Sequence, residues 1–317
     1  MKKRSAFIRK AVLVLTVMAT VGTIALNAQA ATKIGLVQIN QQALFFTQMN
    51  EGAMEAAKAA GVDLAIFNAN NDPAAQNDAI ETYIQDKVDA LLVVAIDVNG
   101  IKPAVTAAKK AGIPVVAIDA IIDGDNDAQI GVDNKMAGVD IGKHMGEYIK
   151  SELKGTAQVG IIGALNSFIQ NVRLDGFKEG LAAAVGDQAK IVDTVDGQNV
   201  QDVAQTASEN LMTANPDMDL VYATGEPALI GAIAATISQN AQSRVRVFGW
   251  DLTAQAIKAI DEGWVTAVVQ QDPKGMGSSG VETALKLLKG EKVEKNIAIP
   301  ITIVTKENVA QFRSMFE

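Results

Sequence analysis

Short runs of aliphatic and β-branched residues alternate with longer amphipathic segments from Thr32 to Val304. This alternation is typical of βαβ units built around parallel sheets. We expect strands at residues 33–39, 63–67, 90–95, 114–118, 158–163, 190–195, 220–223, 245–250, 266–270 and 298–304. We expect helices at residues 46–60, 72–87, 101–111, 136–153, 170–185, 200–214, 227–240, 254–262 and 274–288.

The pattern starts again near Gln158, so the chain divides into two similar halves. About 290 of the 317 residues follow the N-terminal thirty, which exceeds one comfortable core and favours two lobes. The predicted fold class is therefore α/β, with two similar doubly wound parallel-sheet lobes. Periodicity alone does not decide which lobe the helix at 274–288 joins.

Candidate ligand contacts follow the predicted strands, because ligands of open parallel sheets bind beyond the carboxyl ends of the strands. Acids and amides bond to hydroxyl groups there, and flat rings cover the C–H faces of a sugar. The segments after the strands are rich in such side chains and poor in nucleophile–base pairs: residues 40–46 and 68–71, Asp97, Asp119, Asn166, Glu226, Trp250, Asp251, Gln270 and Gln271. Arg173, near the start of a helix, offers a fork of N–H donors.

The first thirty residues have the order of a secretory signal peptide. Five basic residues precede an apolar run from Ala11 to Leu26, and Ala28-Gln29-Ala30 provides small residues for cleavage. A transmembrane anchor is the alternative, but it needs about 20 strongly apolar residues, and Thr16, Thr20 and Gly22 interrupt this run. We expect cleavage after Ala30 and a soluble, periplasmic protein.

Charge and cysteine content narrow the function further. The chain has 28 Lys+Arg and 36 Asp+Glu; removing a segment with five bases and no acids leaves 23 − 36 = −13. This acidity argues against nucleic-acid binding, which depends on Lys and Arg. With no Cys, no disulfide can form, and a core of this size does not need one.

The sequence offers little for enzyme chemistry. Its single histidine, His144, falls within a predicted helix and forms no convincing triad, and the chain has no P-loop motif. The Asp123–Asp127 segment is interpreted as a solvated turn rather than a calcium loop, which needs acids at alternate positions and a closing Glu. We predict no catalytic residue, no cofactor and no metal site.

A set of motifs, in order, now makes the chain recognisable from Lys33 to Val304. The chain resembles the ribose/galactose-type periplasmic binding proteins, the type I group that also supplies the ligand domain of LacI-type repressors. A repressor would carry a basic helix-turn-helix where this chain has its signal-like segment. The motifs are Phe45-Phe46 with Glu51-Gly52-Ala53, Gly112-Ile113-Pro114-Val115 leading to Asp119, Asp133-Asn134, Arg173-Leu174-Asp175-Gly176-Phe177, Asn215-Pro216-Asp217, Gly249-Trp250-Asp251, Gly280-Val281-Glu282-Thr283-Ala284 and Lys289-Gly290-Glu291.

The resemblance implies two lobes joined by a three-segment hinge, with the ligand between them. By similarity the N-terminal lobe is 32–133 plus 272–300, and the C-terminal lobe is 134–271 plus 301–317. The ring positions that enclose the sugar fall on Phe45, Phe46 and Trp250. The acid and amide positions fall on Asp119, Asp251 and Gln271, and the clamping arginine falls on Arg173.

Several positions depart from the family pattern. Ala120 stands where the family often has Arg, and Gly225-Glu226-Pro227 replaces a common Asn-Asp. An aromatic position of the second lobe falls near Asn199, and a helix-entry asparagine aligns with Ala43. We keep Asn199 and Glu226 as candidate contacts. The chain thus has one guanidinium and one ring fewer than the family pattern, so another monosaccharide or a linear polyol is at least as plausible a ligand as ribose.

The sequence therefore predicts a monomeric solute-binding protein that captures a sugar or polyol and passes it to the permease of an ABC importer. A sensory role, with docking to a chemoreceptor or capture of a furanosyl signal molecule, is the alternative. A secreted carbohydrate-active enzyme is the alternative from another class.

Overall fold

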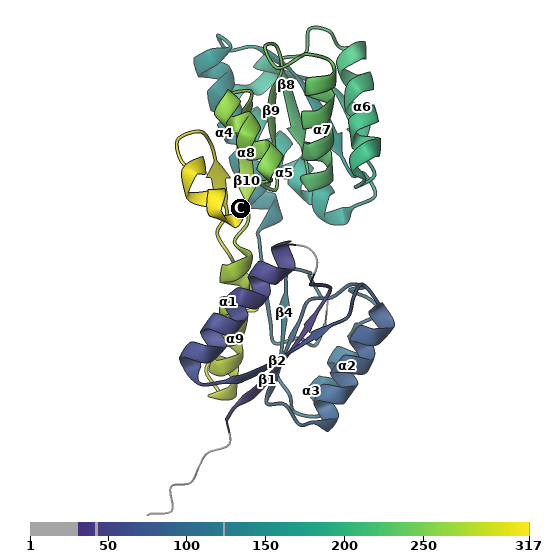
Figure 1. The fold of residues 1–317 in the computed structure, drawn as a ribbon, viewed down its shortest axis with the longest axis vertical. Coiled ribbons are helices and arrows are strands. Elements are labelled where there is room, and N and C mark those ends of the chain that lie inside the picture. Colours follow the sequence, from purple (N-terminus) through teal and green to yellow (C-terminus); the bar gives the residue numbers. More distant parts are fainter. Residues whose placement is uncertain (1–30, 42–43, 123, 317) are drawn as a thin grey trace, which may run out of the picture. The chain divides into compact units, whose positions relative to one another are not determined.

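The computed structural model describes residues 31–41, 44–122 and 124–316. The predicted signal peptide at residues 1–30 and position Ala43 lie outside these described residues. Two six-stranded sheets form within the described part of the chain, and each has helices on both faces (Figure 1). This arrangement confirms the predicted α/β class with two similar lobes.

The first sheet has the order β11-β5-β4-β3-β1-β2, and its neighbouring strands are parallel. Apolar runs such as that of β3 are buried on both sides, as parallel strands between two helical layers require. Its strands are β1 (Lys33–Gln38), β2 (Asp63–Asn68), β3 (Ala90–Val93), β4 (Val115–Ile118), β5 (Ala128–Gly131) and β11 (Asn296–Ala298).

Two helices cover each face of this sheet. Helices α1 (Leu44–Ala60) and α9 (Pro273–Leu288) share one core with the sheet, and α2 (Pro73–Gln85) and α3 (Lys102–Lys110) share the other. The Asp72 carboxylate begins α2 by accepting hydrogen bonds from the backbone N–H groups of Ala74 and Ala75. The packing of α9 on this sheet answers the question that its periodicity left open.

The second sheet has the order β12-β10-β9-β8-β6-β7, and only β12 runs antiparallel to its neighbour among the described strands. Its strands are β6 (Ala157–Gly163), β7 (Ala189–Asp196), β8 (Leu220–Ala223), β9 (Arg246–Trp250), β10 (Val265–Gln270) and β12 (Thr302–Val304). The chain thus passes between the two sheets after β5, after β10 and between β11 and β12.

The helices of this sheet are α4 (Asn134–Glu152) and α5 (Phe168–Val185) on one face, and α6 (Gln201–Ala214), α7 (Glu226–Ser238) and α8 (Ala254–Glu262) on the other. Short 3₁₀ segments follow at Gly186–Gln188 and Val309–Met315. None of the described helices is long and apolar enough to span a membrane.

Helices α4 and α5 pack backbone to backbone through glycines. A Cβ atom at Gly180 would lie 2.0 Å from the carbonyl oxygen of Val139, and one at Gly142 would lie 2.3 Å from that of Phe177. No side chain fits at either position without moving a helix. This close packing fixes the start of α4 beside the first half of α5, where Arg173 lies.

Two expectations about the strands need correction. Strand β5 was not predicted, because Ala128–Gly131 is short and follows a polar turn. The single extended piece expected at 298–304 is two strands, β11 and β12, which end and begin on either side of Pro300 and join different sheets. Proline lacks a backbone N–H and so interrupts a hydrogen-bonded strand.

Candidate functional site

A cavity of ≈660 Å³ is lined by residues from both lobes. It brings together seven of the nine predicted contacts: Phe45, Phe46, Asp119, Arg173, Glu226, Asp251 and Gln271. The carboxyl ends of β4, β9 and β10 supply Asp119, Asp251 and Gln271, and the first turns of α1 and α7 supply the phenylalanines and Glu226. Strand-end reasoning therefore located these seven residues except Arg173, which was predicted from its place near the start of a helix.

Asp119 follows β4 in a left-handed backbone conformation, with φ = 66°. Aspartate tolerates this region better than most residues, and the backbone is held because the Asp119 N–H donates to the carbonyl of Ile130 at 2.7 Å. Burial raises the pKa of Asp119 to about 6, with Asp251 adding to the effect and Arg173 opposing it. The Asp119 carboxyl therefore ionises at a higher pH than an exposed aspartate does in the free protein.

Arg173 is held on three sides. Its Nε donates to Oδ1 of Asn134 at 2.8 Å, and its Nη1 donates to the carbonyl of Thr224 at 3.3 Å. Its guanidinium carbon lies 3.9 Å from the centroid of the Trp250 ring, a cation–π arrangement. Burial lowers the pKa of Arg173, and the nearby Asp251, Tyr222 and Asp119 partly offset this.

Asp251 and Gln271 form a pair on the second lobe. The Gln271 Nε2 donates to Oδ1 of Asp251 at 2.9 Å. Gln270 fixes the backbone beside them, because its Nε2 donates to the carbonyl of Gln271 at 2.8 Å and its Oε1 accepts from the Leu252 N–H at 3.1 Å. Burial raises the pKa of Asp251, whereas Arg173 and the Gln271 N–H lower it.

Glu226 lies at the rim of the cavity, in the first turn of α7. Its side chain is exposed, and the helix N-terminus favours a negative charge there. Even so, partial burial raises the pKa of Glu226, and the nearby Asp251 adds to this.

The opposite wall carries an aromatic pair. The rings of Phe45 and Phe46 meet edge to face, with centroids 5.4 Å apart, and both are half-buried. Each ring keeps some apolar surface toward the cavity, which suits contact with C–H groups.

Trp250 differs from the expectation that its ring lines the pocket. It is 0% exposed, and Arg173 lies over the ring face. Its Nε1 donates to the hydroxyl of Tyr222 at 2.9 Å, and Tyr222 in turn stacks on Phe177 with centroids 3.9 Å apart. The indole therefore supports Arg173 from behind, because the guanidinium occupies the face that a sugar ring would use.

Asn199 also lies apart from the cavity-lining residues. It is exposed in the loop between β7 and α6, with φ = 57°, and its Oδ1 accepts from Nε2 of Gln170 at 2.8 Å. Gln170 Oε1 accepts from the hydroxyl of Thr224 at 2.6 Å. Asn199 thus joins a polar chain that leads through Thr224 to Arg173.

Sequence reasoning missed several residues of the site. Gln48 lines the cavity from α1, is 7% exposed, and forms no hydrogen bond through its side chain with any described residue. Asn134 and Gln170 hold Arg173 directly and through Thr224. Helical spacing offered a signal, because Gln48 comes three residues after Phe45 and Gln170 three before Arg173, on the same helix faces.

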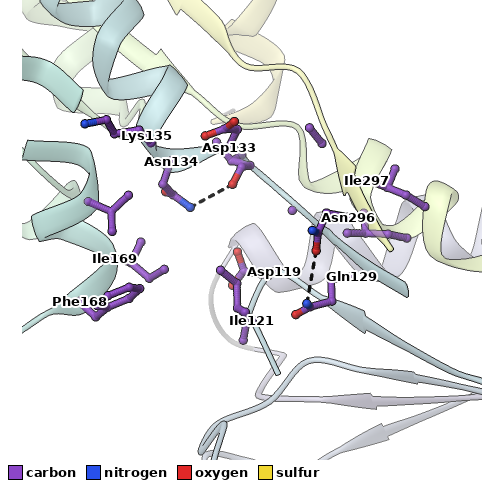
Figure 2. Close-up of a pocket in the computed structure, with 16 residues that line it drawn as sticks. Asp119, Ile121, Gln129, Asp133, Asn134, Lys135, Phe168, Ile169, Asn296 and Ile297 are labelled. Atoms are coloured by element: carbon purple, nitrogen blue, oxygen red, sulfur yellow. Dashed lines mark hydrogen bonds between the residues drawn. The ribbon is translucent and has the colours of Figure 1, made fainter. Parts of the chain in front are cut away.

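A second cavity of ≈380 Å³ lies on another side of Asp119. Figure 2 shows Phe168 and Ile169 of α5 across it from Asp119 and Ile121, with Gln129 donating to Asn296 at 3.4 Å. Its walls are largely apolar, and Phe168 is 73% exposed. The concentrated polar groups therefore belong to the first cavity.

The described residues contain no group of three or more His, Cys, Asp or Glu side chains placed to hold a metal ion. His144 lies in α4 beside the rings of Phe248 and Tyr148, away from the residues that line the first cavity. The first cavity offers groups suited to binding: three acids that accept hydrogen bonds, amides that donate and accept, one guanidinium that donates, and two aromatic rings.

A family model described as a periplasmic binding protein domain matches residues 34–292. The ribose import binding protein RbsB of Escherichia coli (strain K12) is 30% identical over 305 residues, covering 94% of this chain and 99% of that protein. An ABC transporter solute binding protein from Actinobacillus succinogenes 130z, solved with bound D-allose, has a TM-score of 0.76 at 25% identity and covers 88% of this chain and 99% of its own. A solute binding protein from Bacillus halodurans C-125, solved with bound myo-inositol, has a TM-score of 0.75 at 26% identity, covering 91% and 100%.

Proposed function

We propose, since this chain belongs to the periplasmic binding protein domain family, that it captures a monosaccharide or related polyol and delivers it to the permease of an ABC importer. The observation that carries this proposal is the first cavity, where acids and amides from both lobes meet one guanidinium and an aromatic pair. The family also includes a relative named for ribose import and neighbours solved with D-allose and myo-inositol.

The cavity suits a compact ligand with many hydroxyl groups. Asp119, Asp251 and Glu226 accept hydrogen bonds from hydroxyls, and Arg173 donates to ring or hydroxyl oxygens. Phe45 and Phe46 cover the C–H face of the ligand. Specificity follows from the buried polar groups, because an analogue that lacks a hydroxyl leaves one of them unpaired.

Ligand binding would be coupled to closure of the two lobes. A ligand that contacts residues of both lobes at once binds the closed form better and shifts the population toward it. We assign residues 32–133 plus 272–300 to one lobe and 134–271 plus 301–317 to the other, so that the three crossing segments form the hinge. The closed surface is the one that the permease recognises, and the ligand leaves chemically unchanged.

We further propose that residues 1–30 direct export and are cleaved after Ala30, leaving a monomeric protein in the periplasm. The excess of acidic over basic residues fits a freely diffusing carrier rather than a nucleic-acid binder.

A thermal-shift screen of the chain from Ala31 onward tests this function. The panel contains pentoses, hexoses, ketoses, linear and cyclic polyols, and several amino acids as controls. A ligand that binds only the folded protein raises the melting temperature once its concentration exceeds Kd. We expect a clear increase with one sugar or polyol. An increase with an amino acid alone would contradict the proposal.

A further inference from the structure

The first cavity has an unusual balance of charge. Among the described residues that line it, three are acids, namely Asp119, Glu226 and Asp251, and one is a base, Arg173. With every group ionised, the walls carry a net charge of about −2 at neutral pH. Lys274 does not offset this charge, because it pairs with Glu51 at 3.0 Å and lines a different cavity.

Arg173 is partly engaged within the protein. Two of its nitrogens donate to Asn134 and to the Thr224 carbonyl, and its face rests on Trp250. Among the ion pairs within the described residues, none joins Arg173 to one of the three acids. Its charge therefore acts on the acids only across the cavity, and its remaining N–H groups, which include both on Nη2, are available to hydroxyl oxygens of a ligand.

The acceptors, by contrast, are mostly unused. Of the three acids, only Asp251 accepts a side-chain hydrogen bond from another described residue, through Gln271. The carboxylates of Asp119 and Glu226 have no such donor within the described chain. The Gln48 amide, 7% exposed and without a partner among the described residues, adds an acceptor oxygen on the facing wall.

Closing such a cavity on a neutral ligand is costly. Like charges repel more strongly as water leaves, and each carboxylate loses hydration that hydroxyl groups only partly replace. The raised pKa values of all three acids reflect the same burial. An ammonium group removes both problems, since it carries a positive charge and three donors without adding an acceptor.

We propose that the ligand is a sugar or polyol that carries a protonated amine, held among Asp119, Asp251 and Glu226. This inference rests on the proposed function and narrows the ligand to an aminated member of that class. The hydroxyl groups of the same ligand bond to Arg173 and Gln48.

Matched sets of probes test the proposal. Each set contains a hydroxyl parent, its free amine and its N-acetyl derivative: glucose, glucosamine and N-acetylglucosamine; the galactose series; and sorbitol with 1-amino-1-deoxysorbitol and its N-acetyl form. Calorimetric titration of the chain from Ala31 onward at about pH 7, where such amines carry charge, gives Kd for each. We expect the amine to bind at least about tenfold more tightly than its parent and its N-acetyl form in any set that binds, the scale of one charged hydrogen bond.

A charge-neutral variant of the site separates a local contact from a general attraction. Glu226→Gln keeps the shape of the side chain and breaks no internal hydrogen bond with a described residue, so it should fold normally. It is expected to reduce the ratio of amine to parent affinity by about tenfold. Glu81→Gln is the matched control, because it makes the same charge change on the exposed surface of α2 and should leave the ratio unchanged.

The outcomes separate this inference from the proposed function. If parents bind as tightly as their amines in every set that binds, the amine proposal is overturned and the carrier function stands. An amine preference that Glu81→Gln reduces as much as Glu226→Gln does would also overturn it. If no sugar or polyol in either panel binds, both the proposed function and the inference are overturned.

Discussion

Asp119 follows β4, and burial raises the pKa of its carboxyl group, so the stability of the free protein depends on pH. Its pKa is raised to about 6 in the folded protein, against 3.8 for the exposed group. The stability that this group contributes is therefore fully present below pH 3.8 and is lost as the pH rises through about 6.

The substitution Asp119→Asn removes this titration. At about pH 7.5 we expect it to raise the free energy of unfolding of the ligand-free protein by at most about 3 kcal/mol, and by less to the extent that water reaches the side chain. Near pH 4 the benefit should vanish. Urea unfolding of both proteins at the two pH values measures the difference; a benefit equal at both would contradict the assignment.

Ligand binding should show the opposite trend. Hydroxyl or ammonium donors stabilise the Asp119 carboxylate, so binding by the wild-type protein weakens by up to about tenfold for each pH unit below 6. Asp119→Asn lowers the affinity at neutral pH and flattens this dependence. Titration of both proteins with the ligand between pH 5 and pH 8 measures how the affinity depends on pH. Parallel pH profiles for the two proteins would exclude Asp119 as the group responsible for this dependence.

Trp250 shows what sequence reasoning does not reach at the residue scale. Its place at the end of β9 was predicted correctly, but the direction of its ring depends on Arg173, a residue 77 positions earlier (250 − 173) on helix α5. Strand ends reveal where side chains gather. They do not reveal which of two neighbours takes the surface and which lies behind it.

Its structural role leads to a stability prediction. Trp250→Phe leaves the buried Tyr222 hydroxyl without its indole partner, and we expect a loss of about 1–3 kcal/mol in the free energy of unfolding. Adding Tyr222→Phe removes the orphaned hydroxyl and should recover part of that loss. Trp264→Phe is the matched control, because its partner Glu262 is exposed and water can replace the bond. Denaturant unfolding checks the order; a Trp264→Phe loss as large as that of Trp250→Phe would contradict it.

At the scale of elements, the contact between α4 and α5 positions the start of α4 beside Arg173. Gly180→Ala places a methyl group against the Val139 carbonyl, so the helices must separate. We expect a loss of about 1–3 kcal/mol or more in stability, together with weaker ligand binding, because Asn134 moves away from Arg173. Lys178→Ala, at an exposed position on the same helix, should change stability by less than about 0.5 kcal/mol.

Thermal or denaturant unfolding, with a ligand titration, measures both effects. A stable Gly180→Ala variant with wild-type affinity would show that the helices can part without moving Arg173.

The helices and most strands could be predicted because their hydrophobic periods are long and clear. Strand β5 could not be predicted, because its four residues after a polar turn are too few to show a hydrophobic period. The division of 298–304 between two sheets depends on partners elsewhere in the chain: Ala298 pairs with Gly131, and Thr302 pairs with Gln270. Likewise, Gln48 belongs to the site only because α1 brings it to the same cavity as Asp251.

In the whole molecule, the first cavity is the place where a ligand would contact both lobes. Its residues come from segments as far apart as α1 and β10, and the chain crosses between the sheets beside them. Only a ligand that contacts both sides can couple binding to closure. The central claim is therefore that affinity resides in this cavity and depends on both of its walls.

Calorimetric titration of the best sugar or polyol from the ligand panels tests this claim most directly. It compares the wild-type chain with Asp119→Asn on one wall, Asp251→Asn on the other, and the exposed control Asp187→Asn. We expect one ligand per chain, an affinity at least about tenfold lower in each cavity variant, and no change in the control. Wild-type affinity in both cavity variants would place the binding site elsewhere and contradict the assignment of the first cavity.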